Sequence, residues 1–369
     1  MVGTLIMAVS CMMGQHNEES AEKILRPLSE TREVCDIGNH VKEVSFKRMP
    51  ENVLMSDVMK LLVHENGDVI IQDMASQLLL LKESADSLEV IANRGRASNE
   101  YLVPRDIALS GENLLLLDDT EIRSFGLYEK LSCKSFDVPV NVPCDAIAPC
   151  SGDGVYLFSA FPLKFKDSRK ENDYLLYSAD LDEKKVRKFI RREDCTFTIG
   201  NISQSSGNRY YLRPQNSRHI FYELTESGPV PSYKIDFGKK NIPDRYYYST
   251  AGEDVGRYMV AAYYKLPMGL CRTDTHLYFH CCGPDASDVN YIYDEETGRG
   301  INWISGPMDH TARILAATEE EFLVLYQNLE GGLPEVGALA NFIRKEYLKL
   351  GFDDENAQYI VRVRFGKIN

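Results

Sequence analysis

Six segments of one pattern, a tight polar turn followed by a short apolar run, predict an all-β fold built from six similar units. Three of the five intervals between the starts of successive apolar runs are 41 to 45 residues long. A repeat of about 40–50 residues that carries four strands is typical of one blade of a β-propeller. The runs are rich in Val, Ile, Leu and Tyr and are bounded by Gly, Asn, Asp and Ser, which indicates strands. We therefore predict a six-bladed β-propeller from the segments HENGDVIIQD (His64–Asp73), SGENLLLLDD (Ser110–Asp119), SGDGVYLFSA (Ser151–Ala160), SSGNRYYLRP (Ser205–Pro214), TDTHLYFHCC (Thr273–Cys282) and TEEEFLVLYQ (Thr318–Gln327).

The bulk composition fits one folded, acidic body. The chain has 369 residues, which is enough for one large β domain or two ordinary ones. Of these residues 44% are hydrophobic and 26% charged, which supports a real core and argues against a disordered chain. Its net charge of −13 argues against nucleic acid or an anionic membrane surface as a partner, because phosphate binding needs clustered Lys and Arg. No run approaches 18 apolar residues, so any membrane attachment is expected through a lipid anchor alone.

The N-terminus predicts export. Val2–Ser10 is apolar and leads into Cys11, and the stretch from Ala8 to Cys11 resembles a lipobox, although Leu is more usual at position 8 and no Lys or Arg precedes the stretch. We expect residues 1–11 to be a lipoprotein signal with lipid on Cys11, which places the protein in the bacterial periplasm or outer membrane. The alternative is a cytoplasmic protein with an apolar N-terminus. The polar residues 12–40 are predicted to be a tether.

The propeller is predicted over residues 41–369, and each turn-and-run segment supplies the second strand of a blade. The strands expected in the first three blades are Asp57–Val63, Val69–Asp73, Gln77–Lys82 and Ser87–Ala92, then Arg105–Leu109, Leu114–Asp118, Glu121–Tyr128 and Lys130–Val138, then Asp145–Ala148, Val155–Ser159, Tyr174–Ala179 and Lys185–Arg191. Those of blades four and five are Thr196–Ser203, Arg209–Arg213, His219–Leu224 and Val230–Phe237, then Arg257–Tyr264, His276–Cys282, Tyr291–Asp294 and Gly300–Ile304.

The last blade lacks a strand of its own. Only Ala312–Ala316, Phe322–Tyr326 and Gln358–Phe365 have strand character there, and Pro334–Leu350 has apolar residues at helical spacing, which predicts a short inserted helix. Val41–Arg48 alternates as a half-buried strand does. We predict that this N-terminal strand completes the sixth blade, because a closed ring leaves no open edge.

Three segments resemble the marker segments of a known family. They are Asn93–Tyr101 (NRGRASNEY), Tyr233–Pro243 (YKIDFGKKNIP) and Asp353–Tyr359 (DDENAQY), and YKIDFGKKNIP is the most specific. The family comprises exported bacterial six-bladed β-propellers. This resemblance covers residues 41–369 and implies a lipoprotein signal, a tether and a propeller that is similar in fold to NHL-type propellers.

The resemblance does not assign an activity, because most members of that family lack an assigned one and fold alone does not transfer function. The first marker of the family usually reads GRGPGEY. Here Ala97, Ser98 and Asn99 replace its turn glycine and proline, so the loop conformation is expected to differ.

Side chains that suit a ligand gather in the predicted loops between blades. These loops lie beside the central channel on one face of a propeller, which is the default place for a ligand. Guanidinium forks bind carboxylates and planar rings stack on ligands, so Arg and Tyr side chains there suit a polar ligand such as a glycan or an anion. The alternative is that they hold the loops together by hydrogen bonds and packing. The candidates are Arg94, Arg96, Glu100, Tyr101, Arg105, Tyr247, Trp303 and His310.

Enzyme chemistry finds weaker support. The sequence has no GxSxG elbow, no HExxH motif and no Cys/His signature, so no catalytic residue can be assigned. Six-bladed lactonases hold calcium in the channel, and Glu100, Asp106 and Asp145 are conceivable ligands for it. A calcium-dependent hydrolase or lyase is therefore the alternative function.

A run of His and Cys in the fifth blade is the nearest approach to a transition-metal motif. His276, Tyr278, His280 and Cys282 alternate and share one face of a strand. Strand residues two apart lie about 6.5–7 Å from each other, so positions four apart are too distant to share one ion. We predict packing there, with no metal site and no cofactor.

Together these observations predict a non-enzymatic propeller that binds a ligand or a protein at the bacterial cell envelope. Its partner is expected to be a glycan, a peptide or an envelope protein. A further possibility is a structural module whose outer rims form the interface.

Overall fold

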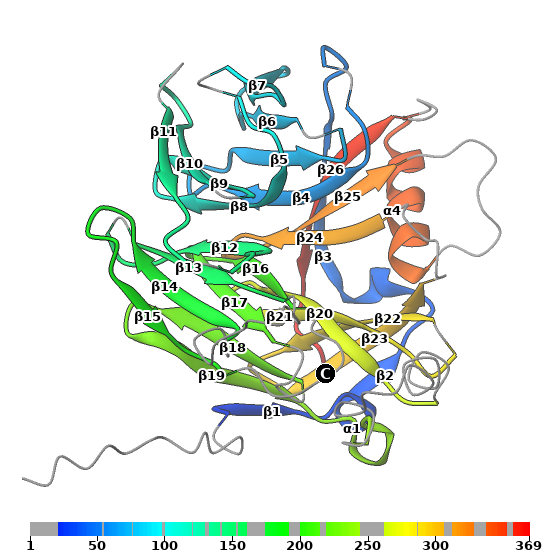
Figure 1. The fold of residues 1–369 in the computed structure, drawn as a ribbon. Coiled ribbons are helices and arrows are strands. Elements are labelled where there is room, and N and C mark those ends of the chain that lie inside the picture. Colours follow the sequence, from blue (N-terminus) through cyan, green and yellow to red (C-terminus); the bar gives the residue numbers. More distant parts are fainter. Residues whose placement is uncertain are drawn as a thin grey trace, which may run out of the picture.

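The computed structural model contains six sheets whose consecutive strands pair antiparallel within each blade, which confirms the predicted six-bladed propeller (Figure 1). The structure describes residues 21–53, 55–75, 77–97, 100–119, 121–129, 133–140, 142–152, 154–160, 174–191, 200–214, 219–243, 262–285, 287–305, 312–327, 337–352 and 357–369.

Each blade runs outward from its first strand, and the first three blades have four strands each. Blade one contains β4 (Val58–Val63), β5 (Val69–Asp73), β6 (Leu78–Leu81) and β7 (Leu88–Ala92). Blade two contains β8 (Pro104–Ser110), β9 (Asn113–Asp118), β10 (Glu121–Gly126) and β11 (Cys133–Asp137). Blade three contains β12 (Ala146–Pro149), β13 (Gly154–Phe158), β14 (Leu176–Asp180) and β15 (Val186–Lys188).

Blades four and five each carry a fifth strand from the N-terminal segment. Blade four contains β16 (Asn201–Ser205), β17 (Arg209–Arg213), β18 (Ile220–Thr225), β19 (Gly228–Ile235) and β1 (Lys23–Leu25). Blade five contains β20 (Lys265–Arg272), β21 (His276–Cys282), β22 (Asp288–Asp294), β23 (Arg299–Ser305) and β2 (Thr31–Glu33). Blade six contains β24 (Ala312–Ala317), β25 (Phe322–Gln327), β26 (Gln358–Phe365) and β3 (Val41–Arg48).

The blades bury both of their faces, as the four consecutive leucines of β6 show. Leu78 and Leu80 pack toward blade two, whereas Leu79 and Leu81 pack toward blade six, and none of the four is more than 1% exposed. A strand that is buried on both sides has no need to alternate polar and apolar residues. Continuous apolar runs such as Leu78–Leu81 are therefore the sign of a sheet held between two others.

Ring closure follows the prediction. β3 pairs antiparallel with β26 along its whole length and becomes the outer strand of blade six. The helix α4 (Ala338–Lys349) lies alongside β25 and β26, and its Tyr347 ring packs against Phe46 and Tyr359 at centroid distances of 6.3 and 5.3 Å (Figure 1). In the described part of the chain, no helix is long and apolar enough to cross a membrane.

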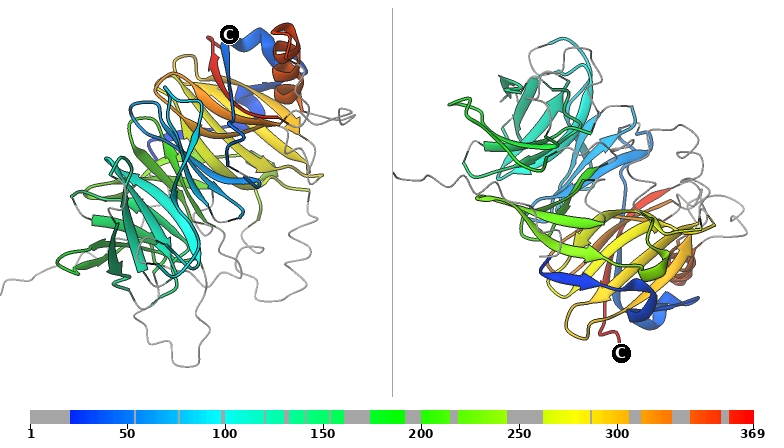
Figure 2. Two further views of the ribbon diagram at one scale, coloured as in Figure 1. Left: turned by 90° about the horizontal axis from the view of Figure 1, so that it is seen from above. Right: turned by 60° about the horizontal axis from the view of Figure 1, so that its bottom comes forward.

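The predicted tether is wrong for residues 21–40. β1 pairs parallel with β19 and β2 pairs parallel with β23, and a 3-10 helix, η1 (Ile37–His40), leads into β3. Figures 1 and 2 show this segment, in blue, along the outer side of the green and yellow sheets. Leu25 and Ile37 anchor it, at 2% and 0% exposure. These apolar residues stand among polar and charged ones without a regular spacing, so they gave no periodic signal.

The first strand of blade five also differs from the prediction. The observed strand is Lys265–Arg272, whereas the predicted strand was Arg257–Tyr264. Of the predicted range, the structure describes residues 262–264, and these precede the strand. Leu266 and Gly269 have positive φ angles of 50° and 62°, and the register against β21 shifts twice. Such an irregular strand lacks the alternation that identifies strands in a sequence.

A half-buried carboxylate joins the N-terminal strand to two blades. Glu295, which follows β22, accepts hydrogen bonds from the Arg272 guanidinium, the Tyr233 hydroxyl at 3.1 Å and the Lys23 ammonium at 3.3 Å. Burial favours a higher pKa for Glu295, but Arg272 and Lys23 outweigh it, so the pKa lies below its usual value. Glu295 thus stays ionised and ties β1, β19 and β20 together.

We expect Glu295→Ala to lower the free energy of unfolding by about 1–3 kcal/mol, because it leaves Arg272 partly buried without its acceptor. The deficit should be full above pH 4.5, the reference pKa, and should shrink as pH falls through the lowered pKa of the folded state. Urea unfolding at several pH values measures both. The adjacent Glu296→Ala, whose pair with Lys367 is exposed, is the matched control and should change stability by less than about 1 kcal/mol. Equal losses from the two variants would contradict this account.

Candidate functional site

A hollow of about 340 Å³ lies at the centre of the propeller, and residues of all six first strands line it. It opens on the face that carries the loops between blades, which we call the loop face and which includes residues 49–53, 100–103, 142–145 and 236–243. The opposite face carries the turns between first and second strands, at 64–68, 111–112, 150–152, 206–208, 273–275 and 318–321, and we call it the hairpin face. The polar side chains in the lining include Lys60, Asp106, Asn201, Ser203, Gln204 and His280.

One glutamine closes the channel between the two faces. The Gln204 side chain on β16 accepts a hydrogen bond from the Val63 backbone N–H and donates one to the Val63 carbonyl, both at 3.1 Å. Val63 belongs to β4, so this contact joins blades four and one across the ring. Gln204 lines the central hollow, and Val63 lines a separate hollow of about 440 Å³ on the hairpin face. The loop-face hollow is therefore blind at this contact.

A second side chain of blade four reaches across to blade two. The buried Tyr210 hydroxyl accepts a hydrogen bond from the Leu109 N–H at 2.9 Å and donates one to the Leu109 carbonyl at 3.0 Å. Burial raises the pKa of Tyr210, so its hydroxyl keeps the proton that it donates. With Gln204, this side chain draws the inner strands together.

Lys60 and Asp106 connect the inner strands of blades one, two and three. The Lys60 ammonium lies 2.6 Å from one Asp106 carboxylate oxygen and 2.8 Å from the Ile107 carbonyl. The other Asp106 oxygen accepts a hydrogen bond from the Ile147 N–H at 2.9 Å. Burial raises the pKa of Asp106, and Lys60 and the backbone N–H groups counteract this only in part. Both carboxylate oxygens of Asp106 are thus engaged within the wall.

The remaining wall residues have more modest partners. Asp145 accepts a hydrogen bond from the Ala160 N–H at 2.6 Å, which holds the start of β12 against the end of β13. The His280 Nδ1 atom lies 3.1 Å from an Asp288 carboxylate oxygen. Burial raises the pKa of Cys271 to about 12, so its thiol is neutral and a poor nucleophile or metal ligand.

Among the residues predicted from sequence, Glu100 shapes its own loop. Its carboxylate accepts a hydrogen bond from the Ala97 N–H at 2.8 Å, and its N–H donates to the Ala97 carbonyl at 3.0 Å. A Cβ atom added to Gly95 would lie within 3 Å of this carboxylate, so a larger residue at that position would displace the Glu100 side chain. Glu100 therefore fits the alternative that these side chains hold the loops together by hydrogen bonds. Its carboxylate does not line the central hollow.

The other predicted residues do not converge on one place. Tyr101 and Trp303 are 0% and 2% exposed and pack in separate cores between blades, so neither ring is available to a ligand at the surface. Arg94 and Arg96 are exposed on one loop, and Arg105 is exposed and pairs with Asp119 at 3.0 Å. Tyr247, His310 and Cys11 lie outside the described residues.

The strand with alternating His and Cys is occupied by packing contacts. His276 is 5% exposed, and its Nε2 atom lies 3.1 Å from the Gly366 carbonyl. Burial lowers the pKa of His276, so its ring is neutral at pH 7. In the described part of the chain, no group of three or more His, Cys, Asp or Glu side chains is arranged to hold a metal ion.

The residues that sequence reasoning missed are polar positions on inner strands. Lys60 interrupts the apolar run VMKLLV, and Asn201, Ser203 and Gln204 make NISQS an unusually polar inner strand. A charged or amide side chain within such a strand was the available signal. The partners of these side chains, however, lie on other blades, and no sequence pattern identifies them.

Known proteins share this architecture. A family model described as a 6-bladed beta-propeller (DUF5128) matches residues 35–311. The chain belongs to this family. It is similar in structure to a Bacteroides fragilis protein that is thought to be exported, with 14% identity, a TM-score of 0.71, and coverage of 93% of this chain and 99% of that one. The virginiamycin B lyase of Staphylococcus aureus has 12% identity, a TM-score of 0.41, and coverage of 76% and 85%. The likeness to the Bacteroides fragilis protein shows the fold alone. A search of curated proteins finds no match.

Membership in this 6-bladed beta-propeller family confirms the resemblance seen in the marker segments. The most specific marker turns the chain out of blade four: the Asp236 carboxylate accepts hydrogen bonds from the Gly238 N–H and the Asn241 amide, at 2.8 and 2.7 Å. These bonds, led by that from Gly238, lower the pKa of Asp236. Phe237 stacks on Tyr264 at a centroid distance of 4.6 Å. This marker is therefore structural.

Gln204→Glu tests the closure of the channel. The variant keeps the acceptor for the Val63 N–H, but its carboxylate cannot donate to the Val63 carbonyl, so we expect a loss of about 1–3 kcal/mol of unfolding free energy near pH 7. Burial raises the pKa of the new carboxyl, whose protonated form can donate. The deficit should therefore be smallest in acid and should grow as pH rises through the folded-state pKa. Urea unfolding measures it, with the half-buried Gln358→Glu as control. A deficit that does not depend on pH would contradict the donor role of Gln204.

Proposed function

We propose that this chain is a non-catalytic, ligand-binding propeller of the bacterial cell envelope, and that the blind loop-face half of its channel is the binding site. One observation carries the proposal: the channel carboxylates of Asp106 and Asp145 are engaged by Lys60 and by backbone N–H groups of neighbouring strands. Calcium needs several uncommitted oxygen ligands. The calcium-dependent alternative therefore loses the ligands on which it depended, since Glu100 is also committed to its own loop.

The chemistry of the hollow favours a polar ligand of low net charge. Lys60 and Asp106 neutralise each other, and Asn201, Ser203 and His280 add amide, hydroxyl and imidazole groups beside apolar Ile314. Convergent polar groups on a partly apolar wall are typical of pockets for small ligands. We propose a glycan or a peptide segment as the ligand, presented by an envelope component.

The location rests on two supports. The similar protein from Bacteroides fragilis is thought to be exported, and the stretch from Ala8 to Cys11 resembles a lipobox. We propose that lipid on Cys11 anchors the protein, and that the N-terminal segment joins the body at blade four, where β1 begins. Metabolic labelling with a palmitate analogue tests the anchor. We expect the protein to take up the label and the Cys11→Ser variant to lose it.

Ligand binding is tested with arrays of bacterial glycans and of peptides probed with the purified protein. We expect Ser203→Ala, which removes one hydroxyl from the hollow, to weaken binding of the best array ligand about tenfold, the equivalent of one hydrogen bond. The control Ser84→Ala changes an exposed serine of blade one and should leave affinity unchanged.

Calcium and a chelator should give the same Tm in thermal unfolding. A Tm that rises with calcium and loses this rise in Asp145→Asn would instead support the hydrolase.

A further inference from the structure

The hairpin face carries a line of three hollows that is separate from the channel site. The outermost, about 110 Å³, lies between blades two and three. The next is about 260 Å³ and shares Ser110 with the first. The third, about 440 Å³, shares Asn208 with the second. We call this continuous line of hollows the hairpin-face groove. Neighbouring hollows in a row suit an extended chain, in which successive side chains follow each other at about 3.3 Å per residue.

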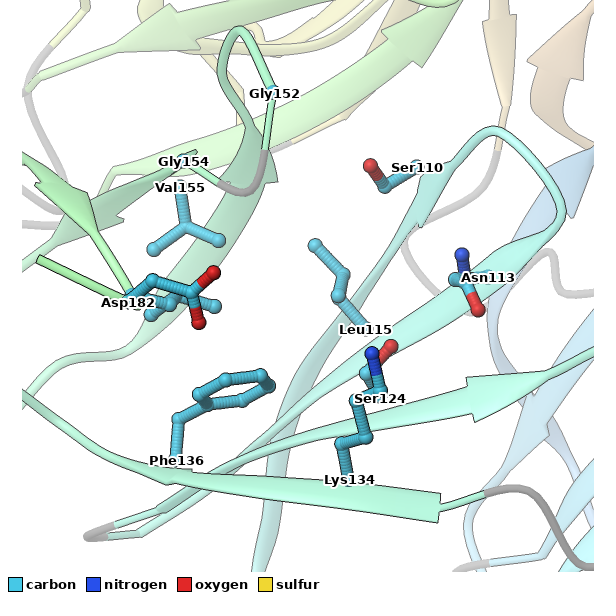
Figure 3. Close-up of a pocket in the computed structure, with 11 residues that line it drawn as sticks. Ser110, Asn113, Leu115, Ser124, Lys134, Phe136, Gly152, Gly154, Val155 and Asp182 are labelled. Carbon is cyan, nitrogen blue, oxygen red and sulfur yellow. The ribbon is translucent and has the colours of Figure 1, made fainter.

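The outermost hollow has an apolar floor between two charged walls. Figure 3 shows Leu115, Phe136 and Val155 between the blades, with Asp182 on one side and Lys134 beside Ser124 on the other. Leu115 and Val155 are buried, whereas Lys134 and Asp182 are exposed at the edge of the hollow. A hollow of this kind suits a single apolar side chain whose backbone passes between the two charges.

The inner end of the groove is acidic. Glu65, Glu319, Glu320 and Glu321 line the third hollow, and Glu226 lines the second. Two arginines of β26 oppose them and are already paired: Arg362 with Glu83 and Glu321, and Arg364 with Glu43, Glu320 and Glu321. Carboxylates therefore remain in excess, and the groove end attracts cations.

We propose that the hairpin-face groove binds an extended peptide segment of a partner protein. The peptide inserts one apolar side chain between blades two and three, and it places Lys or Arg side chains against Glu65 and Glu319. The charge pattern sets its direction, with the apolar anchor at the rim and the basic residues toward the axis. A glycan has neither the apolar anchor nor the cations that this groove selects. The proposal is independent of the channel site.

The experiment is selection of a random peptide library on the intact protein, followed by fluorescence polarisation with the most enriched peptide. We expect enriched peptides to pair an apolar residue with basic ones several positions away. Replacement of the apolar residue by Ala in the peptide should weaken binding about tenfold or more, and Glu319→Lys in the protein should weaken it about five- to tenfold and reduce its dependence on salt.

Three variants locate the site. Ser110→Trp fills the junction of the first two hollows and should abolish binding, with circular dichroism and Tm as checks of folding. Glu33→Lys makes the same charge change on the outer edge of blade five and should leave affinity unchanged, and so should Ser203→Ala in the channel. Failure to enrich any peptide over a protein-free control overturns the proposal, as does binding that is insensitive to Ser110→Trp and Glu319→Lys. Binding lost in Ser203→Ala assigns the peptide to the channel and also overturns the groove.

Discussion

Burial of both faces of every blade is the constraint on which this fold depends. Leu78–Leu81 illustrates it, since alternate side chains of one strand belong to two different cores. A sheet of this kind is stable only between two neighbours, so the row of blades has to close into a ring. The closing strand β3 comes from the far end of the chain, and it places α4 over the junction through Phe46 and Tyr347. The apolar cores thus determine the ring. The short N-terminal strands β1 and β2 add to the outer edges of blades four and five.

Polar side chains determine what happens at the axis. Six first strands meet there with their edges toward the channel, and unpaired polar groups on those edges need partners. Lys60 and Asp106 connect three consecutive blades, and Gln204 and Tyr210 extend from blade four to blades one and two. The outcome is a narrowed channel that is blocked at Gln204. The hydrogen bonds that stabilise the inner strands also engage the carboxylates of Asp106 and Asp145, which the calcium-dependent alternative would need as ligands.

The two faces of the ring consequently differ in chemistry. The loop face opens onto a small polar hollow with nearly balanced charge, around Lys60, Asp106 and Ser203. The hairpin face has shallow connected hollows with an apolar outer end and an acidic inner end, at Phe136 and Glu319. The two proposed sites therefore differ in chemistry, one polar and the other apolar at one end and acidic at the other.

The number of blades, the position of most strands and the source of the closing strand could be predicted from the sequence, because turn-and-run segments and the alternation of Val41–Arg48 are local patterns. The sequence did not determine the place of residues 21–40 or of Lys265–Arg272, because isolated anchors such as Leu25 and an irregular strand around Gly269 leave no period to detect. The site depended on the tertiary structure. Tyr101 and Trp303 have the chemistry of ligand-binding residues but lie in cores, whereas Gln204 and Lys60 acquire their roles from partners on other blades. Such contacts join residues as much as 141 positions apart, and only the closed ring brings them together.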